Sequence, residues 1–404
     1  MTKASRKEFI GLMACIMSIS ALSIDAMMPG LSQIGVSLEV QNPNDIQFII
    51  SSVLLGMAFG LPLYGPFSDA FGRMKALYLG LSIFLFGSTV SVMATNFETM
   101  IVGRLLQGFG TASCRISSVA MIRDRFEGPE MGQVMSFIMI IFILVPAIAP
   151  SIGQVILLIS GWRYIFGLFI AQGLLAALWL KYRQEETLPP SKRLPFSLRT
   201  IWSGTRETLS HRVTRGYTIA AGLMFGALVA YLSTAQQLLQ EQYEMGETFA
   251  LAFGAIAIGI GISSYLNAKL VMKYRMEQIC VFSLYMFAGL SGAFYLYIKI
   301  IDGLPSLNLL LGFLMATLFF LGMIFSNFGT LAMLPHGHIA GVASSVISAV
   351  QTFISVLLGG YIGYLYDATP EPLVLGFFVI STLSVIVTIK VSGHGLRSKV
   401  NDLA

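Results

Sequence analysis

The chain has 404 residues, of which 55% are hydrophobic and 11% are charged, and its mean hydropathy is +0.78. This composition lies far outside the range of soluble globular proteins. Apolar stretches of about 20 residues, the length that a helix needs to cross a bilayer, recur along the whole sequence. The sequence therefore predicts an all-α polytopic membrane protein without a soluble domain.

Twelve transmembrane helices are expected, in two sets of six. The first set covers roughly residues 9–28, 46–64, 77–94, 100–122, 131–158 and 162–180. The second set covers roughly residues 217–239, 249–270, 279–298, 307–333, 340–365 and 373–389. The longest polar stretch of the chain separates the two sets. We therefore expect an N-terminal six-helix bundle at 1–182, a cytoplasmic linker at 183–216 and a C-terminal six-helix bundle at 217–404.

The placement of Lys and Arg predicts the orientation. If the N-terminus is cytoplasmic, most of the 25 Lys and Arg fall in termini and loops on the cytoplasmic side, while the opposite loops carry acidic residues. Cytoplasmic loops of membrane proteins are enriched in Lys and Arg. Both termini are therefore expected in the cytoplasm. The net charge of +5 then reflects topology, and no nucleic-acid partner is expected.

The link between the second and third spans reads "GPFSDAFGRMK". Gly65 permits close approach of another helix, and Gly72 suits a tight turn. Asp69 ends the second span, where the partial negative charge of the helix terminus disfavours a carboxylate. We therefore expect Asp69 to bind a cation or another helix's N-terminus, such as that of the eleventh span, and Arg73 to bind Asp124 or a lipid phosphate. The alternative is an ordinary basic turn that only sets topology.

Several motifs resemble those of the major facilitator superfamily. The pattern G-x-x-S-D-x-x-G-R-x-K resembles its loop 2–3 signature, and "RLLQGFG" at 104–110 resembles its fourth-helix motif. "VPAIAPSIGQ" at 145–154 is similar to the antiporter motif of the fifth helix. "LQEQYEMG" at 239–246 and "AMLPHGHIAGVASS" at 332–345 resemble the bicyclomycin/chloramphenicol-resistance type of drug:proton antiporter. The chain departs from that type at Gln154, in "STAQQ" and at Arg115. The resemblance therefore predicts the fold but does not identify the substrate.

The resemblance implies two six-helix bundles of inverted repeats around a central cavity. It also implies a proton-coupled antiporter that exports small amphiphilic drugs or metabolites, phenicol-like or bicyclomycin-like, by alternating access. The expected location is the bacterial cytoplasmic (inner) membrane. The expected partners are a small-molecule substrate, protons and the lipid bilayer. The protein is expected to be a monomer without a cofactor, with the proton gradient as its energy source.

Charges inside the expected spans are costly, so each is a candidate functional residue. Asp25 is a candidate proton carrier, because an acid whose surroundings change can bind a proton on one side and release it on the other. A structural acid in a salt bridge, or one in water at the outer mouth, is the alternative. Arg104 is its candidate coupling partner, pairing with Asp25 or facing the backbone of the first span. Alternatively, Arg104 only fastens the fourth span to the first.

Arg115 follows Arg104 by close to three helical turns, so the two are expected on one face. Gly108, Thr111 and Ser118 share that face, which we expect to line the cavity. Thr111 and Arg115 would then bind substrate, and the guanidinium would favour an acidic or strongly hydrogen-bond-accepting group. The alternative is that Arg115 extends to the cytoplasmic interface.

Pro146, Pro150 and Gly153 predict an irregular fifth helix, because each proline removes a backbone hydrogen bond. By the resemblance, this segment seals the cavity while the two halves rock. Together with Gly65, Asp69, Gly72 and Arg73 it forms the expected conformational gate. The alternative for the fifth helix is a simple kink.

Polar residues in the second set of spans are further candidates for substrate binding: Tyr231, Gln236, Gln237, Asn327 and Gln351. Membrane helices also use such residues to bind one another, which is the alternative for each.

Transport is the expected activity, rather than catalysis. The four histidines fall in cytoplasmic segments, and the sequence lacks zinc-protease, serine-hydrolase and phosphate-loop motifs. The alternative to the exporter is a facilitator or proton symporter for a small polar or anionic metabolite. The proline-containing fifth span and the aromatic and Met-rich lining favour the exporter.

Overall fold

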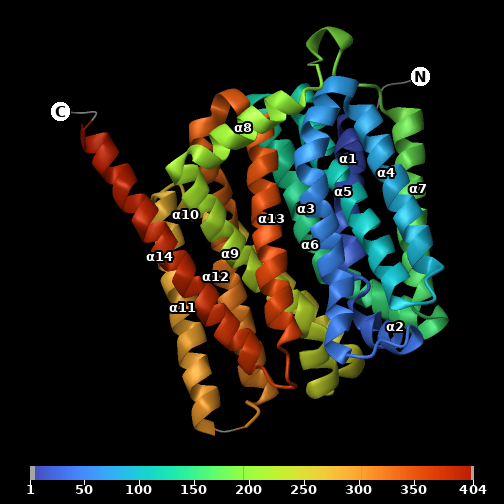
Figure 1. Cartoon of the computed structure of the whole chain (residues 1–404), viewed down its shortest axis with the longest axis vertical. Coiled ribbons are helices and arrows are strands. Elements are labelled where there is room, and N and C mark those ends of the chain that lie inside the picture. The colour runs from blue at the N-terminus through green and yellow to red at the C-terminus, as the bar shows by residue number, and fades with distance from the viewer. Residues whose placement is uncertain (1–4, 194, 302, 402–404) are drawn as a thin grey trace. The chain divides into compact units, whose positions relative to one another are not determined.

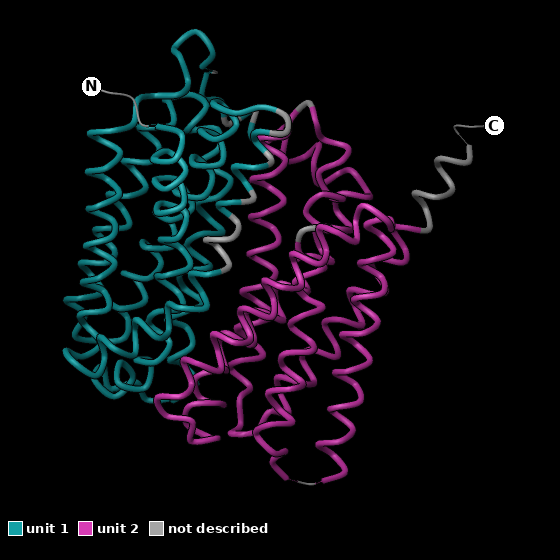
Figure 2. Tube along the Cα trace, turned by 180° about the vertical axis from the view of Figure 1, so that it is seen from behind, with its two compact units in different colours: residues 1–201 teal, residues 202–404 magenta. Residues whose placement is uncertain are grey.

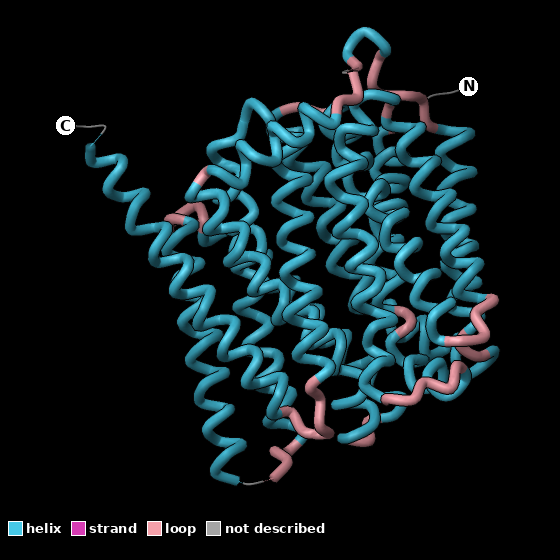
Figure 3. Tube along the Cα trace, viewed as in Figure 1, coloured by secondary structure: helices cyan, strands magenta, loops and turns pink. Residues whose placement is uncertain are grey.

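The computed structural model describes residues 5–193, 195–301 and 303–401, and in these ranges the chain forms helices and no strands (Figure 1). Loops are confined to the segments between helices (Figure 3). The chain divides into two compact units, residues 1–201 and 202–404 (Figure 2). The expected linker, 183–216, contributes residues to both units.

Unit 1 contains six long helices and one short helix. Their bounds are α1 Arg6–Asp25, α2 Leu31–Ser37, α3 Phe48–Phe71, α4 Arg73–Val92, α5 Phe97–Arg125, α6 Gly128–Ser160 and α7 Arg163–Arg183. The helix α5 lies at the centre of the unit, because it packs against α3, α4 and α1. Its approach to α3 requires Gly108, where an added Cβ would overlap the backbone carbonyl of Val53.

Unit 2 contains the other six long helices. Their bounds are α9 Arg212–Ala235, α10 Phe249–Leu270, α11 Met276–Ile301, α12 Leu307–Met333, α13 Ala340–Tyr364 and α14 Glu371–Asn401. A π-helix, Gln236–Gln242, continues α9. The helix α9 is central, since it packs against α13, α14 and α12. An amphipathic helix in the polar stretch, α8 Leu198–Ser210, crosses the boundary between the units.

The helices confirm the expected membrane architecture. Ten of the described helices are long and apolar enough to cross a membrane. The other two long helices are α5, which carries Arg104 and Arg115, and α6, whose described apolar part is shorter, Leu144–Ser160. Each of the twelve expected spans overlaps one long helix, and those at 249–270 and 307–333 coincide with α10 and α12. The protein is a multi-pass membrane protein.

Candidate functional site

Arg104 is completely buried in α5 and joins three helices of unit 1. Its Nε donates to the carbonyl of Ile49 in α3 at 3.0 Å, and its Nη2 donates to the carbonyl of Ser23 in α1 at 2.9 Å. Its Nη1 donates to Oε1 of Gln107 at 2.6 Å, and Gln107 in turn donates to Ser88 of α4 at 2.8 Å. The guanidinium is therefore held by neutral oxygens in charge-assisted hydrogen bonds.

Asp25 is the last residue of α1 and is 4% exposed. Among the described residues, none donates a hydrogen bond to its carboxylate or forms an ion pair with it. Of the two arrangements expected for Arg104, the structure has the one in which the guanidinium faces the backbone of α1, at Ser23. Asp25 is thus a buried acid that has no counter-ion in the described part of the chain, and it lies in the helix that Arg104 binds.

The helix α6 meets the end of α1 at Gly153. An added Cβ on Gly153 would overlap the carbonyl oxygen of Ala26, so only glycine permits this contact. The expectation of an irregular helix around Pro146 and Pro150 is wrong, because α6 continues through both prolines as one helix. Each proline still lacks a backbone donor, but the surrounding turns keep helical geometry.

The polar face of α5 is buried at Gly108, where α3 packs on it, and is exposed further along the helix, at Arg115. Gly108 packs on Val53, and the hydroxyl of Thr111 is buried and donates to the carbonyl of Gly108 at 2.9 Å. Arg115 is exposed, and it forms no hydrogen bond or ion pair with the described residues. The charge of Arg115 therefore has no partner among the residues that the structure describes, whereas Thr111 uses its hydroxyl within the helix.

The hairpin between α3 and α4 is a tight turn. Gly65 is buried in α3, and Gly72 adopts φ 104° between the two helices, a conformation that favours glycine. Arg73 follows as the first residue of α4 and is 7% exposed. The turn therefore brings a basic side chain back into the unit.

Arg73 supplies the cation that Asp69 was expected to need. It forms an ion pair with Asp69, and its Nε donates to Oδ2 of Asp124 at 3.0 Å. Its Nη1 also donates to Ser68 at 3.2 Å. The predicted contact between Arg73 and Asp124 is therefore present, and the hairpin is fastened to the end of α5.

Glu186 also binds this hairpin, a contact that the sequence did not predict. Its carboxylate accepts hydrogen bonds from the backbone N–H groups of Arg73, at 3.0 Å, and Met74, at 3.2 Å. A carboxylate at a helix N-terminus bonds N–H groups that have no partner in the helix and complements the helix dipole. Thr187 adds a bond to Asp124 at 2.9 Å. The start of the polar stretch after α7 is thus part of unit 1.

In unit 2, two candidates lie at the end of α9. Tyr231 is buried and stacks on Phe253 of α10, with ring centroids 5.6 Å apart and an interplanar angle of 14°. Gln236 begins the π-helix and donates to Oε1 of Glu241 at 3.0 Å. A π-helix repeats its bonds every five residues, which brings these two side chains onto one face.

Asn327 is a helix-packing residue in this structure. Its amide and that of Asn267 bond each other reciprocally, at 2.7 and 3.3 Å, and both residues are buried. Its Nδ2 also donates to the carbonyl of Met323 at 3.0 Å. The pair joins α12 to α10. This agrees with the alternative interpretation of Asn327, in which the residue binds a neighbouring helix.

Gln351 and Tyr231 lie at different levels of unit 2. The contacts of Gly222 with Ile354 and of Gly359 with Val229 show that α9 and α13 run parallel. Gln351, three residues before Ile354, therefore lies level with about residue 219 of α9, which is about 18 Å along the axis from Tyr231 at 1.5 Å per residue. The structure does not gather the candidates of this unit into one cluster.

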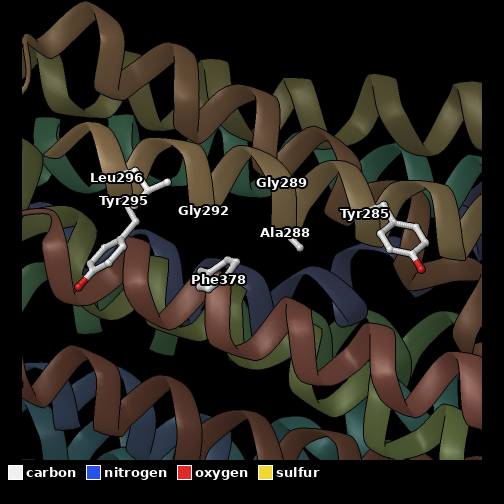
Figure 4. A pocket seen from close by; sticks show the side chains of 7 residues that line it. All are labelled: Tyr285, Ala288, Gly289, Gly292, Tyr295, Leu296 and Phe378. Carbon is white, nitrogen blue, oxygen red and sulfur yellow. The ribbon is translucent and has the colours of Figure 1, made fainter. Parts of the chain in front are cut away.

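A cavity of about 540 Å³ lies between α11 and α14 (Figure 4). Its lining is Tyr285, Ala288, Gly289, Gly292, Tyr295, Leu296 and Phe378. It contains none of the expected site residues, and it is apolar apart from the two tyrosine hydroxyls. All of its lining residues belong to unit 2.

Long apolar helices in two units, with charged side chains buried in unit 1, are typical of membrane transporters. The chain belongs to the major facilitator superfamily, whose family model matches residues 13–360. The fold is also that of the superfamily: the solved structure of the xylose transporter XylE from E. coli superposes with a TM-score of 0.67 at 14% identity, covering 94% of this chain and 96% of XylE. The protein is a transporter and not an enzyme.

Three relatives cover most of the chain. The "Uncharacterized MFS-type transporter YdgK" of Bacillus subtilis (strain 168) is 28% identical over 95% of this chain and 94% of its own length. The "Bicyclomycin resistance protein homolog" of Haemophilus influenzae (strain ATCC 51907 / DSM 11121 / KW20 / Rd) is 27% identical over 97% and 98%. The "Multidrug resistance protein MdtL" of Citrobacter koseri (strain ATCC BAA-895 / CDC 4225-83 / SGSC4696) is 27% identical over 84% and 85%. These similarities support the resemblance to drug:proton antiporters.

Proposed function

We propose that the protein is a proton-coupled antiporter that exports small amphiphilic compounds. The observation that carries the proposal is Asp25, a buried carboxyl without a counter-ion among the described residues, at the end of the helix that Arg104 binds. The named relatives add support, because two of those described carry drug-resistance names. The proposed location is the bacterial cytoplasmic membrane, with both termini in the cytoplasm and the protein acting as a monomer.

Asp25 would couple the proton to the substrate through its solvation. An unpaired charged carboxylate is costly in a buried site and far less costly in water. Asp25 would therefore bind a proton when its surroundings close and release it when they open to the cytoplasm. Arg104 would keep α1, α3 and α5 together during this change, since its bonds to Ser23 and Ile49 do not depend on the charge of Asp25.

Arg115 would influence which compounds are exported. It is an exposed charge of α5 that has no hydrogen-bond or ion-pair partner among the described residues. A substrate with an acidic or strongly accepting group would supply the missing partner. In unit 2, Tyr231, which stacks on Phe253, and Gln236, which donates to Glu241, would be further substrate-binding residues. No cofactor or nucleic acid takes part in this proposal.

The test is substrate-induced proton release by the detergent-purified protein in weakly buffered solution. A panel should contain phenicol-like and bicyclomycin-like compounds and neutral, cationic and anionic amphiphiles. Antiport predicts that a transported compound releases protons in the wild type and not in Asp25→Asn. Proton uptake on binding would instead indicate a symporter. Transport without any proton change would indicate a facilitator.

A further inference from the structure

The cavity between α11 and α14 has no part in the proposed function (Figure 4). Gly289 gives the cavity its depth, because open space surrounds the position of an added Cβ. An added Cβ on Gly292 would lie 2.9 Å from the ring of Phe378, so this ring packs directly on the α11 backbone. Tyr285 and Leu296 project at the two ends of the cavity and are 54% and 63% exposed. The cavity is therefore an apolar groove on the surface of unit 2, bounded at both ends by large side chains.

An ion pair lies in line with this groove. Lys299, in the last turn of α11, pairs with Glu371, the first residue of α14. Gly292 comes seven residues before Lys299, and Phe378 comes seven residues after Glu371. Seven residues complete nearly two helical turns, so each of these two spacings stays on one face of its helix. The ion pair and the contact of Gly292 with Phe378 thus lie on one seam between two antiparallel helices, about 10.5 Å apart at 1.5 Å per residue.

The groove has about the length of one membrane leaflet. Tyr285 and Tyr295 are ten residues apart, about 15 Å along α11. The hydrocarbon core of a bilayer is about 30 Å thick, so one leaflet supplies about 15 Å. Both α11 and α14 are long and apolar enough to cross a membrane, and hydrocarbon disfavours charge. The pair of Lys299 and Glu371 therefore belongs at the level of the lipid headgroups, with the groove beside the acyl chains of the same leaflet.

An acyl chain fits this groove better than a helix of a second copy. A helix is about 10–12 Å wide with its side chains, and close approach to a neighbour requires small residues along the line of contact. Tyr285 lies on the same line of α11 as Gly292, seven residues earlier, and interrupts it. A flexible acyl chain can lie between Tyr285 and Leu296. It would also supply the dispersion contacts that a void in hydrocarbon lacks.

The ion pair presents charges of both signs to a headgroup. The side chains of Lys299 and Glu371 are 52% and 30% exposed, so a lipid can reach both. Lysine binds phosphate as a point charge, and a carboxylate attracts a cationic ammonium group. An anionic headgroup without an ammonium group would lie beside Glu371 uncompensated. Nζ of Lys299 lies 5.7 Å from the ring centroid of Tyr295, which places the Tyr295 hydroxyl, a donor, close to this level. These charges favour a zwitterionic phospholipid over an anionic one.

We propose that this groove binds one zwitterionic phospholipid. One acyl chain lies along Gly289 and Gly292, the phosphate lies at Lys299, and the ammonium group of the headgroup lies at Glu371. The bound lipid contacts both α11 and α14 and thereby stabilises their packing. The proposal uses no residue of the proposed transport mechanism, so it can be tested on protein that is not transporting.

The test is native mass spectrometry of the detergent-purified protein, with phosphatidylcholine or phosphatidylglycerol added in steps. We expect one phosphatidylcholine per chain at low lipid concentration and weaker binding of phosphatidylglycerol. Gly289→Leu should weaken phosphatidylcholine binding about tenfold, the effect of excluding about two buried methylene groups. Gly312→Leu in α12 is the matched control, because Gly312 is likewise exposed with open space around an added Cβ. Lys299→Gln/Glu371→Gln should remove the preference for phosphatidylcholine.

Three results would overturn the inference. The first is equal binding of phosphatidylcholine by the wild type and Gly289→Leu. The second is an equal loss in Gly289→Leu and Gly312→Leu, which would indicate unspecific binding around the helices. The third is a wild-type dimer without bound lipid that Gly289→Leu converts into a monomer, which would assign the groove to a second copy. Ala288→Phe fills the same groove and replaces Gly289→Leu if that variant fails to fold. Equal binding of the two lipids by the wild type would contradict the headgroup assignment.

Discussion

The carboxylate of Glu186 accepts a hydrogen bond from the backbone N–H of Arg73 at 3.0 Å, although 113 positions separate the two residues. It binds the first N–H groups of α4 at the tight turn after α3. The polar stretch that follows α7 is therefore attached to the first hairpin of its own unit before it leads on to α8.

Glu186→Ala should loosen this hairpin. The N–H groups of Arg73 and Met74 would lose their acceptor, and α4 would lose a favourable charge at its N-terminus, worth about 1 kcal/mol. Hydrogen–deuterium exchange should become faster at these two amides. Glu185→Ala is the matched control, because it removes a neighbouring acid and leaves both bonds in place. Equal exchange in the two variants would show that the contact does not stabilise the turn.

Asp25→Asn should abolish export driven by a pH gradient in proteoliposomes while leaving some substrate binding. Asparagine keeps the size of the side chain but cannot carry a proton. Asp45→Asn makes the same chemical change in the short 3-10 helix before α3, Pro43–Gln47, and should transport normally. If Asp25→Asn concentrates substrate against a gradient at the wild-type rate, the coupling acid lies elsewhere.

Arg104→Lys should destabilise the protein, because lysine cannot reach Ser23, Ile49 and Gln107 together. The expected loss is about 1.5–3 kcal/mol, the range for a hydrogen bond to a charged group. Thermal unfolding in detergent would measure it. Arg115→Lys is the control, since Arg115 has no bonds to lose among the described residues. Similar melting temperatures for the two variants would contradict the fastening role of Arg104.

Arg115→Leu should change selectivity. Loss of the exposed guanidinium should reduce export of acidic and acceptor-rich compounds more than export of neutral or cationic ones. Initial export rates across a panel of matched compounds would measure the effect. A uniform loss across the panel would argue for a role in folding or at the membrane interface.

Gly153→Ala should force α6 away from α1, because the new methyl group overlaps the carbonyl of Ala26. Overpacking of this kind costs about 1–3 kcal/mol, and thermal unfolding would detect it. Gly167→Ala in α7 is the control, since open space surrounds that position. An unchanged melting temperature for Gly153→Ala would show that the two helices separate without cost.

Hydropathy and spacing predict the long helices because each crossing needs a long apolar stretch, which is a local property of the sequence. They also identify Asp25 and Arg104, since charge within such a stretch is rare. They do not predict the contact of Glu186, which depends on how a distant polar segment folds back. They also do not show whether Asn327 packs against another helix or binds substrate. Its partner, Asn267, lies in another helix, and an asparagine in a membrane helix can serve either purpose.

The reciprocal amide pair of Asn267 and Asn327 has a consequence for how these two positions can vary. Each side chain bonds both the donor and the acceptor group of the other, so a change at one leaves at least one polar atom of the other unbonded inside the unit. Replacement of both by leucine removes both requirements together. Selection should therefore tolerate the joint replacement better than either single one, and the two positions should covary across descendants of this chain.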